Sequence, residues 1–177
     1  MVNKPALIGI LCLAIVASAY AIYCVTRGGQ EQVLSVFAVE NNIRLTMSVE
    51  KTDYRMGETI NIAFEVRNDS SEALGLYHPG HLGVFVFDVH DENNVQLGSW
   101  PGEATDVFSE TNIRPGETYS ENLEWDQTVY VVRWGPGAHL GGAPLGPGRY
   151  YLQGWIGGST YSILRTPSLE ITLENTG

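Results

Sequence analysis

The segment TINIAFEVRN, residues 59–68, alternates apolar and polar side chains and decides the fold class. Its apolar side chains point to one side of an extended chain, and they are Ile60, Ile62, Phe64 and Val66. Its polar side chains point to the other side, and they include Thr59, Asn61, Glu65 and Arg67. A period of two with one apolar face is typical of a strand in an antiparallel sheet that is buried on one face and wet on the other. The segment therefore predicts a half-buried strand, which ends in a polar turn over residues 68–71.

Segments on both sides of this strand repeat the pattern. Between residues 33 and 50 the apolar side chains fall on odd positions, namely Val33, Phe37, Val39, Ile43, Leu45, Met47 and Val49. Because this phase survives the interruption at Asn41, it predicts one long kinked strand instead of a hairpin. Residues 84–87 are apolar on both faces, as in a central strand, and polar residues 91–94 turn the chain back. Alternation returns at Tyr119, Leu123 and Trp125, and again at Leu169, Ile171 and Leu173.

Short strands separated by turn residues predict a mainly β protein. This strand-and-turn pattern covers the chain apart from the N-terminal run. We expect an antiparallel immunoglobulin-like β-sandwich of about seven to nine strands. Phe64 and Trp125 lie on the apolar phases of their strands, so both are expected in its core.

An uncharged run over residues 6–25 precedes the β-rich part of the chain. As a helix it would span about 30 Å, the thickness of the hydrocarbon core of a bilayer. The run therefore predicts one N-terminal transmembrane helix. Lys4 and the terminal amine favour a cytoplasmic N-terminus, which places the C-terminal domain outside the cytoplasm. The residues expected to anchor the helix are Ala6, Leu7 and Ile8 in the apolar core and Tyr20 and Tyr23 at the outer interface.

A cleaved secretory signal is the alternative to a retained anchor. Residues 7–16 would form its apolar core, and Ala17-Ser18-Ala19 or Ala19-Tyr20-Ala21 its cleavage site. The apolar stretch continues through Ile22 and Val25, which favours retention as a signal-anchor. Both routes deliver residues 28–177 to the outside.

Length and composition predict a single outer domain. We expect a cytoplasmic tip and anchor over residues 1–27, a linker and the start of the first strand over residues 28–42, and the sandwich over residues 43–177. Both cysteines, Cys12 and Cys24, fall in the apolar run, so the outer domain has no disulfide.

The charge balance excludes some partners. The net charge is -10, and residues 28–177 retain all twenty acids with eight of the ten bases, which gives them a net charge of -12. A surface this acidic repels nucleic acid and anionic lipid head groups, so neither is expected as a partner.

Several motifs resemble known modules. Residues 54–59, YRMGET, followed by Val66-Arg67-Asn68, resemble the first hairpin of prokaryotic surface immunoglobulin-like modules. Four further motifs resemble, in the same order, those of the BsuPI family, named for an intracellular proteinase inhibitor: Val86-Phe87-Asp88-Val89, Pro115-Gly116-Glu117, Leu123-Glu124-Trp125-Asp126-Gln127 and Pro147-Gly148-Arg149-Tyr150-Tyr151-Leu152. The resemblance covers about residues 43–175 and implies an immunoglobulin-like sandwich. The resemblance does not identify an inhibitory loop in this sequence. The chain also departs from the family pattern between Gln127 and Pro147.

The sequence lacks the arrangements that catalysis requires. It contains no Gly-x-Ser-x-Gly elbow, no cysteine in the outer domain and no glycine-rich loop that opens a helix. His78 and His81 flank a Pro-Gly turn and would need a third ligand to hold a metal ion. The acidic residues Asp88, Asp91, Glu92 and Asn93 lack the spacing of an EF-hand. We therefore expect neither enzyme activity nor a metal or other cofactor.

Candidate partner-binding residues come from the Gly- and Pro-rich stretch that separates Gln127 from Pro147. It is expected to be a long irregular loop over residues 128–146, because glycine and proline interrupt regular structure. The candidates are the loop residues Tyr130, Trp134, His139 and Leu140, together with Trp100, since exposed aromatic side chains anchor many protein interfaces. Asn68-Asp69-Ser70 is also a possible glycosylation site.

These observations favour a membrane-anchored binding or accessory domain that acts through protein–protein contacts. Two alternatives remain open: a structural subunit of a larger membrane or envelope complex, and an inhibitor of an extracellular protease. The sequence specifies no small-molecule ligand.

If the anchor is retained, the native protein should fractionate with membranes and begin at Met1 or Val2. N-terminal sequencing of the mature protein checks this. A mature chain that begins at Tyr20 or Ile22 would show instead that the run is a cleaved signal.

Overall fold

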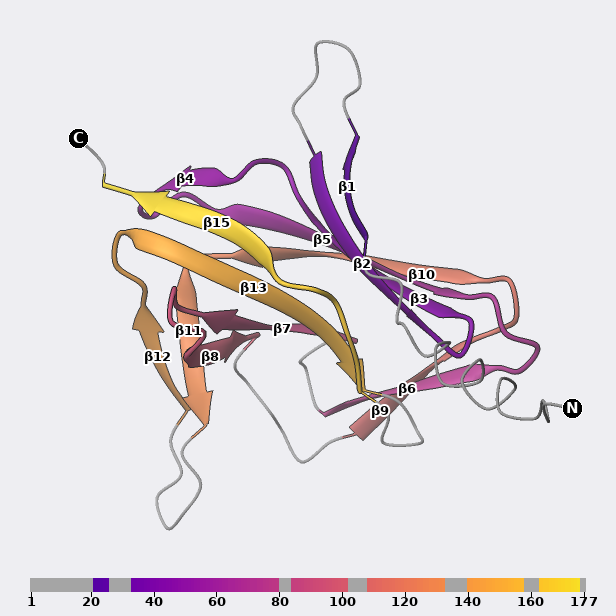
Figure 1. The fold of residues 1–177 in the computed structure, drawn as a ribbon. Coiled ribbons are helices and arrows are strands. Elements are labelled where there is room, and N and C mark those ends of the chain that lie inside the picture. The colour runs from indigo at the N-terminus through magenta and orange to yellow at the C-terminus, as the bar shows by residue number, and fades with distance from the viewer. Residues whose placement is uncertain are drawn as a thin grey trace, which may run out of the picture.

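The computed structural model describes residues 21–25, 33–79, 84–101, 108–132, 140–157 and 163–175. These residues form fifteen strands and no helix, so the expectation of a mainly β protein is confirmed (Figure 1). The number of strands exceeds the expected seven to nine because several short segments add edge strands and hairpins. Among the described residues, no helix is long and apolar enough to span a membrane.

Three sheets make up the described part of the chain. A five-stranded sheet has the order β1 (Ala21–Val25), β2 (Val33–Glu40), β3 (Ile43–Val49), β5 (Ile60–Asn68), β10 (Thr118–Trp125). An eight-stranded sheet has the order β12 (Leu140–Pro144), β11 (Thr128–Val132), β8 (Gln96–Trp100), β7 (Phe85–His90), β13 (Gly148–Gly157), β15 (Leu169–Glu174), β4 (Asp53–Arg55), with β14 (Ile163–Arg165) paired to β13. The third sheet consists of β6 (Leu74–Pro79) and β9 (Phe108–Ile113). The pairings are antiparallel except that of β15 with β4, which is parallel.

Aromatic side chains join the inner faces of the two larger sheets. Phe64 of β5 stacks on Phe85 of β7 with ring centroids 5.0 Å apart, and Phe87 of β7 meets the ring of Trp125 of β10 edge-on at 5.2 Å. All four side chains are buried, so the predicted inward phase of Phe64 and Trp125 is confirmed. Gly154 of β13 has to be glycine, because a Cβ there would lie 2.5 Å from Cε1 of Phe64.

Residues 33–49 form a hairpin and not one kinked strand, so that prediction was wrong. Asn41 and Asn42 have φ values of 49° and 62°, a left-handed conformation that asparagine tolerates and that a tight two-residue hairpin turn requires. The turn pairs odd positions with even ones, as in Val36 opposite Met47. The inner face of β2 therefore carries even positions, and Val33, on the predicted apolar phase, is 42% exposed. β2 pairs with β3 along its whole length, so residues 33–40 belong to the same sheet as β3.

The end of the N-terminal apolar run is a strand. Ala21–Val25 forms β1, which pairs antiparallel with β2, so the predicted helix does not reach Val25 in the described structure. Tyr23 lies in β1. The other predicted anchor residues, Ala6, Leu7, Ile8 and Tyr20, lie outside the described residues.

A buried glutamine fastens the turn that precedes β5. The Nε2 atom of Gln127 donates to the carbonyl oxygens of Arg55 and Glu58, both at 2.7 Å. Its Oε1 atom accepts from the amide of Gly57 at 3.0 Å. Gln127 is 2% exposed, and its amide joins three backbone groups of this turn, one of which, the Arg55 carbonyl, also accepts from the Glu58 amide at 3.0 Å.

A buried asparagine fastens the opposite end of β5. The Nδ2 atom of Asn68 donates to the carbonyl oxygens of Glu72 and Ile113 at 2.8 and 2.9 Å. Its Oδ1 atom accepts from the amide and the hydroxyl of Ser70 at 3.0 and 2.6 Å. The amide thereby fixes the polar turn after β5 and joins it to the end of β9.

Replacing Phe64 by alanine should lower the free energy of unfolding by about 3 to 5 kcal/mol, because it empties the centre of the contact between the sheets. Glu65→Ala on the adjacent exposed position should change it by less than about 0.5 kcal/mol. Denaturant titration of both variants checks the assignment of faces. Equal losses at the two positions would contradict it.

Candidate functional site

The structure brings together two of the predicted partner-binding residues. Trp100 ends β8, and Tyr130 lies on the neighbouring strand β11, with their ring centroids 5.4 Å apart. Both side chains are half-buried. The ring of Tyr130 covers Gly142 of β12, where a Cβ would lie 3.0 Å from Cε1 of the tyrosine. A glycine on β12 therefore lets the tyrosine lie across the edge of the sheet.

The stretch over residues 128–146 is largely a hairpin, so the expected long irregular loop was wrong. β11 and β12 pair from Thr128 opposite Pro144 to Val132 opposite Leu140. The hairpin belongs to the fold because Val129 is buried in the core, with 3% of its surface exposed. Of the remaining predicted contact residues, Leu140 opens β12, whereas Trp134 and His139 lie outside the described residues.

An apolar strip adjoins the Trp100–Tyr130 pair. β12 is the outer strand of the eight-stranded sheet, and its residues 141–144 are exposed and uncharged. Val131 on β11 is 42% exposed. Val131 was not among the predicted contact residues. We call Trp100, Tyr130, Val131 and strand β12 the edge surface.

Among the described residues, no three His, Cys, Asp or Glu side chains lie close enough together to hold a metal ion. His78 lies in β6, and His81 is outside the described residues. Asp91 serves the turn between β7 and β8, since its Oδ1 atom accepts from the amides of Val95 at 2.8 Å and Asn93 at 2.9 Å. Both hydrogen bonds lower the pKa of the Asp91 carboxyl, and the one from Val95 has the larger effect.

The polar cluster around Asp88 was not predicted. Asp88 is 4% exposed on β7, and its Oδ1 atom accepts from the Ser99 hydroxyl at 2.7 Å and from Nε1 of Trp155 at 3.1 Å. Its Oδ2 atom lies 2.6 Å from Nη1 of Arg165, whose guanidinium packs 5.5 Å from the centroid of the Trp155 ring. Both carboxylate oxygens are thus paired, so the cluster ties β7, β8, β13 and β14 together. An aspartate inside an otherwise apolar strand was the signal for it.

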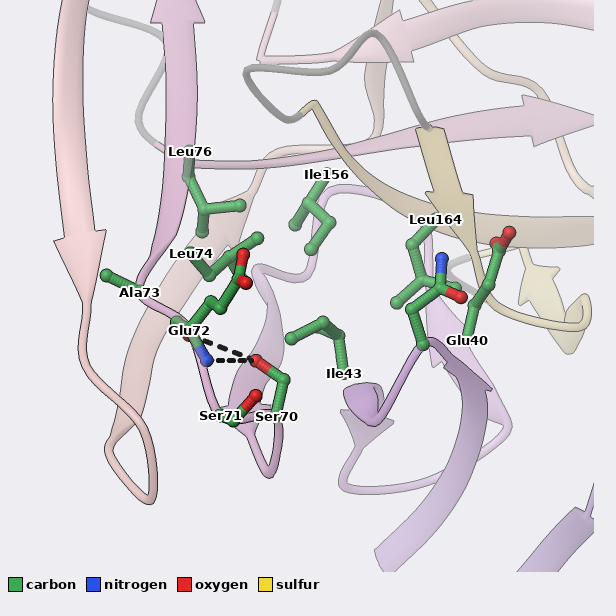
Figure 2. Close-up of a pocket in the computed structure, with 11 residues that line it drawn as sticks. Glu40, Ile43, Ser70, Ser71, Glu72, Ala73, Leu74, Leu76, Ile156 and Leu164 are labelled. Atoms are coloured by element: carbon green, nitrogen blue, oxygen red, sulfur yellow. Dashed lines mark hydrogen bonds between the residues drawn. The ribbon is translucent and has the colours of Figure 1, made fainter.

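A pocket of about 400 Å³ opens between the β2–β3 hairpin, the turn after β5, and strands β6, β13 and β14 (Figure 2). Its apolar walls are Ile43, Leu74, Leu76, Ile156 and Leu164. Its polar rim is Glu40, Asn41, Ser70, Ser71 and Glu72. No sequence motif indicated this pocket, because its residues come from separate segments that only the fold brings together.

The Asn68 side chain has a structural role. It is fully buried, and its Nδ2 atom donates two hydrogen bonds to backbone carbonyls. A glycan on that nitrogen would replace one of those hydrogens and would need space that the fold fills. The folded domain therefore offers no free amide at the predicted glycosylation site.

The chain matches no protein-family model and no curated protein. Among solved structures it is similar to a β-glucosidase from Listeria innocua in complex with isofagomine, with 15% identity and a TM-score of 0.43 over 74% of this chain and 16% of that one. It is also similar to the β-glucosidase EmGH1 from Erythrobacter marinus, with 14% identity and a TM-score of 0.39 over 72% of this chain and 15% of that one. A third similar structure is the structural-genomics target SoR45, with 15% identity and a TM-score of 0.34 over 79% of this chain and 92% of that one. The chain thus spans 16% or less of the length of these two β-glucosidases.

Replacing Asp88 by alanine should lower the free energy of unfolding by about 2 to 3 kcal/mol, because it leaves the Trp155 indole and the Ser99 hydroxyl without their acceptor. Glu170→Ala provides the control, since it removes an exposed carboxylate 3.1 Å from Arg149. That change should cost about 1 kcal/mol or less. Guanidinium titration distinguishes the two, and a loss at Asp88 no larger than at Glu170 would contradict the assigned role.

Proposed function

We propose that the chain is a membrane-anchored, extracytoplasmic domain that binds other proteins and does not catalyse a reaction. The uncharged residues 6–20, which lead into β1, support an apolar N-terminal segment that targets or anchors the chain to a membrane. Two facing sheets, antiparallel except for the β15–β4 pair, and motifs that resemble those of the BsuPI family support an immunoglobulin-like sandwich as the binding scaffold.

The edge surface carries this proposal. Half-buried aromatic side chains such as Trp100 and Tyr130 are the residues that contribute most to protein interfaces. An outer strand presents unpaired backbone groups to which a partner strand can add. Many exposed edges carry charged residues that prevent such pairing, but residues 140–144 contain none.

Permanent assembly into a membrane complex is the second candidate function. The exposure of Val131 favours it, because obligate interfaces are more apolar than transient ones. The two functions share the edge surface and differ in whether the domain is stable and monodisperse without its partner.

Loss of the edge surface should abolish partner binding without unfolding the domain. We would isolate the tagged full chain from membranes of its own host in mild detergent and compare it with the variant Tyr130→Ala/Val131→Asp. Partner recovery should fall about tenfold or more, as expected for an interface that loses an aromatic anchor. The control is Val95→Asp, because Val95 is 55% exposed in the turn between β7 and β8.

Equal recovery by the wild type and the Tyr130/Val131 variant would contradict the assignment of the edge surface. A partner that co-purifies in fixed stoichiometry, and without which the domain aggregates, would identify a structural subunit. An extracellular protease that is recovered in an inactive state would instead support the inhibitor alternative.

A further inference from the structure

The pocket in Figure 2 lies away from the edge surface. Its walls come from β3, β6, β13 and β14 and from the hairpin and turn residues around them. Figure 1 shows β11 and β12 at one end of the domain and the β2–β3 hairpin with β6 at the other. The two regions share no residue, so the pocket is a candidate for a separate activity.

The walls of the pocket leave apolar surface uncovered. Leu76 and Ile156 are 1% and 3% exposed and form part of the core beneath the pocket. Ile43, Leu74 and Leu164 pack against that core but are only partly buried. In Figure 2 the side chains of Ile43, Ile156 and Leu164 point into the same space. A ligand that fills this space would remove their remaining apolar surface from water.

The rim of the pocket is acidic. Glu40 and Glu72 are both exposed, and neither carboxylate forms an ion pair or hydrogen bond within the described residues. The rim also lacks a basic side chain, since its remaining members are Asn41, Ser70 and Ser71. With a net charge of -10 on the whole chain, this mouth attracts cations and repels carboxylates and phosphates.

The rim is held in place before any ligand arrives. The Ser70 hydroxyl donates to Oδ1 of buried Asn68 at 2.6 Å, and it lies 3.0 Å from the carbonyl oxygen of Glu72 and 3.3 Å from the Glu72 amide (Figure 2). On the opposite side, the tight turn at Asn41 follows Glu40 directly. Because Glu72 lies on a hydrogen-bonded turn and Glu40 ends a paired strand, ligand binding costs little ordering of the backbone beneath them.

We propose that this pocket binds a short peptide segment in which an apolar side chain is flanked by lysine or arginine. The apolar side chain enters between Ile43, Ile156 and Leu164, and the flanking cations pair with the carboxylates of Glu40 and Glu72. Anionic amphiphiles such as fatty acids are disfavoured, because their head groups would meet both carboxylates at the mouth.

The test uses peptides of defined sequence and the full chain, held in phosphatidylcholine nanodiscs so that no free detergent competes for the apolar walls. The probe is acetyl-Gly-Lys-Phe-Leu-Lys-Gly-amide. One comparison peptide has both lysines replaced by glutamate, and the other has Phe-Leu replaced by Ser-Ser. Binding is followed through the ¹³C-methyl resonances of isoleucine and leucine. The probe should give saturable shifts at Ile43, Ile156 and Leu164, and both comparison peptides should bind at least about tenfold more weakly.

Matched charge variants locate the cation contacts. Glu40→Gln/Glu72→Gln should weaken binding of the probe about tenfold and reduce its salt dependence. Glu65→Gln/Glu124→Gln removes the same two charges from exposed positions on β5 and β10 and should leave binding unchanged. The Tyr130→Ala/Val131→Asp variant should also bind like the wild type, which separates this result from the function proposed for the edge surface.

Three results would overturn the proposal. One is the absence of saturable shifts with the probe at millimolar concentration, and another is equal binding of the charge-reversed or serine peptide. The third is equal loss in the two double-glutamine variants, which would show that net charge and not the rim attracts the peptide.

Discussion

The domain depends on keeping β5 fixed at both ends by buried side-chain amides. Gln127 holds the turn over residues 55–58 before β5, and Asn68 holds the turn over residues 70–72 after it. Both side chains are buried, so a side-chain amide left without its partners there would cost about 1 to 3 kcal/mol. Cys24 in β1 is the one cysteine among the described residues, so no disulfide within them supports these turns and the hydrogen bonds hold β5 in place.

The same contacts explain why the recognisable sequence motifs occur together. The YRMGET motif supplies the carbonyl oxygens and the amide that Gln127 binds, and Gln127 ends the Leu-Glu-Trp-Asp-Gln motif. The Pro-Gly-Glu turn meets β5 directly, since the Gly116 amide donates to the Asn68 carbonyl at 2.6 Å and the Asn68 amide to the Glu117 carbonyl at 3.0 Å. In this chain the motifs therefore report on folding.

Sequence reasoning predicted the features that neighbouring residues determine and missed those that depend on residues far apart in the chain. β5 and β15 were predicted correctly because one face of each strand is buried along its whole length. The segment over residues 33–49 was misread because the left-handed turn at Asn41 and Asn42 reverses the chain without disturbing the odd-numbered apolar pattern. Asp88 could be noticed as an unusual residue, but its partners lie 11 to 77 positions away. The pocket required four separate segments to be placed in space, which no local pattern encodes.

The hairpin turn at Asn41 and Asn42 also constrains how the sequence can change over evolutionary time. Since the turn pairs odd positions with even ones, a single inserted residue would rotate β2 by one position and turn Val36 and Ala38 from the core to the surface, unless a bulge absorbed it. Insertions of two residues preserve the pairing and leave the core intact. Because Glu40 and Asn41 also border the pocket, such paired insertions would reshape its mouth alone. Related chains could therefore differ in the shape of this mouth while keeping the same scaffold.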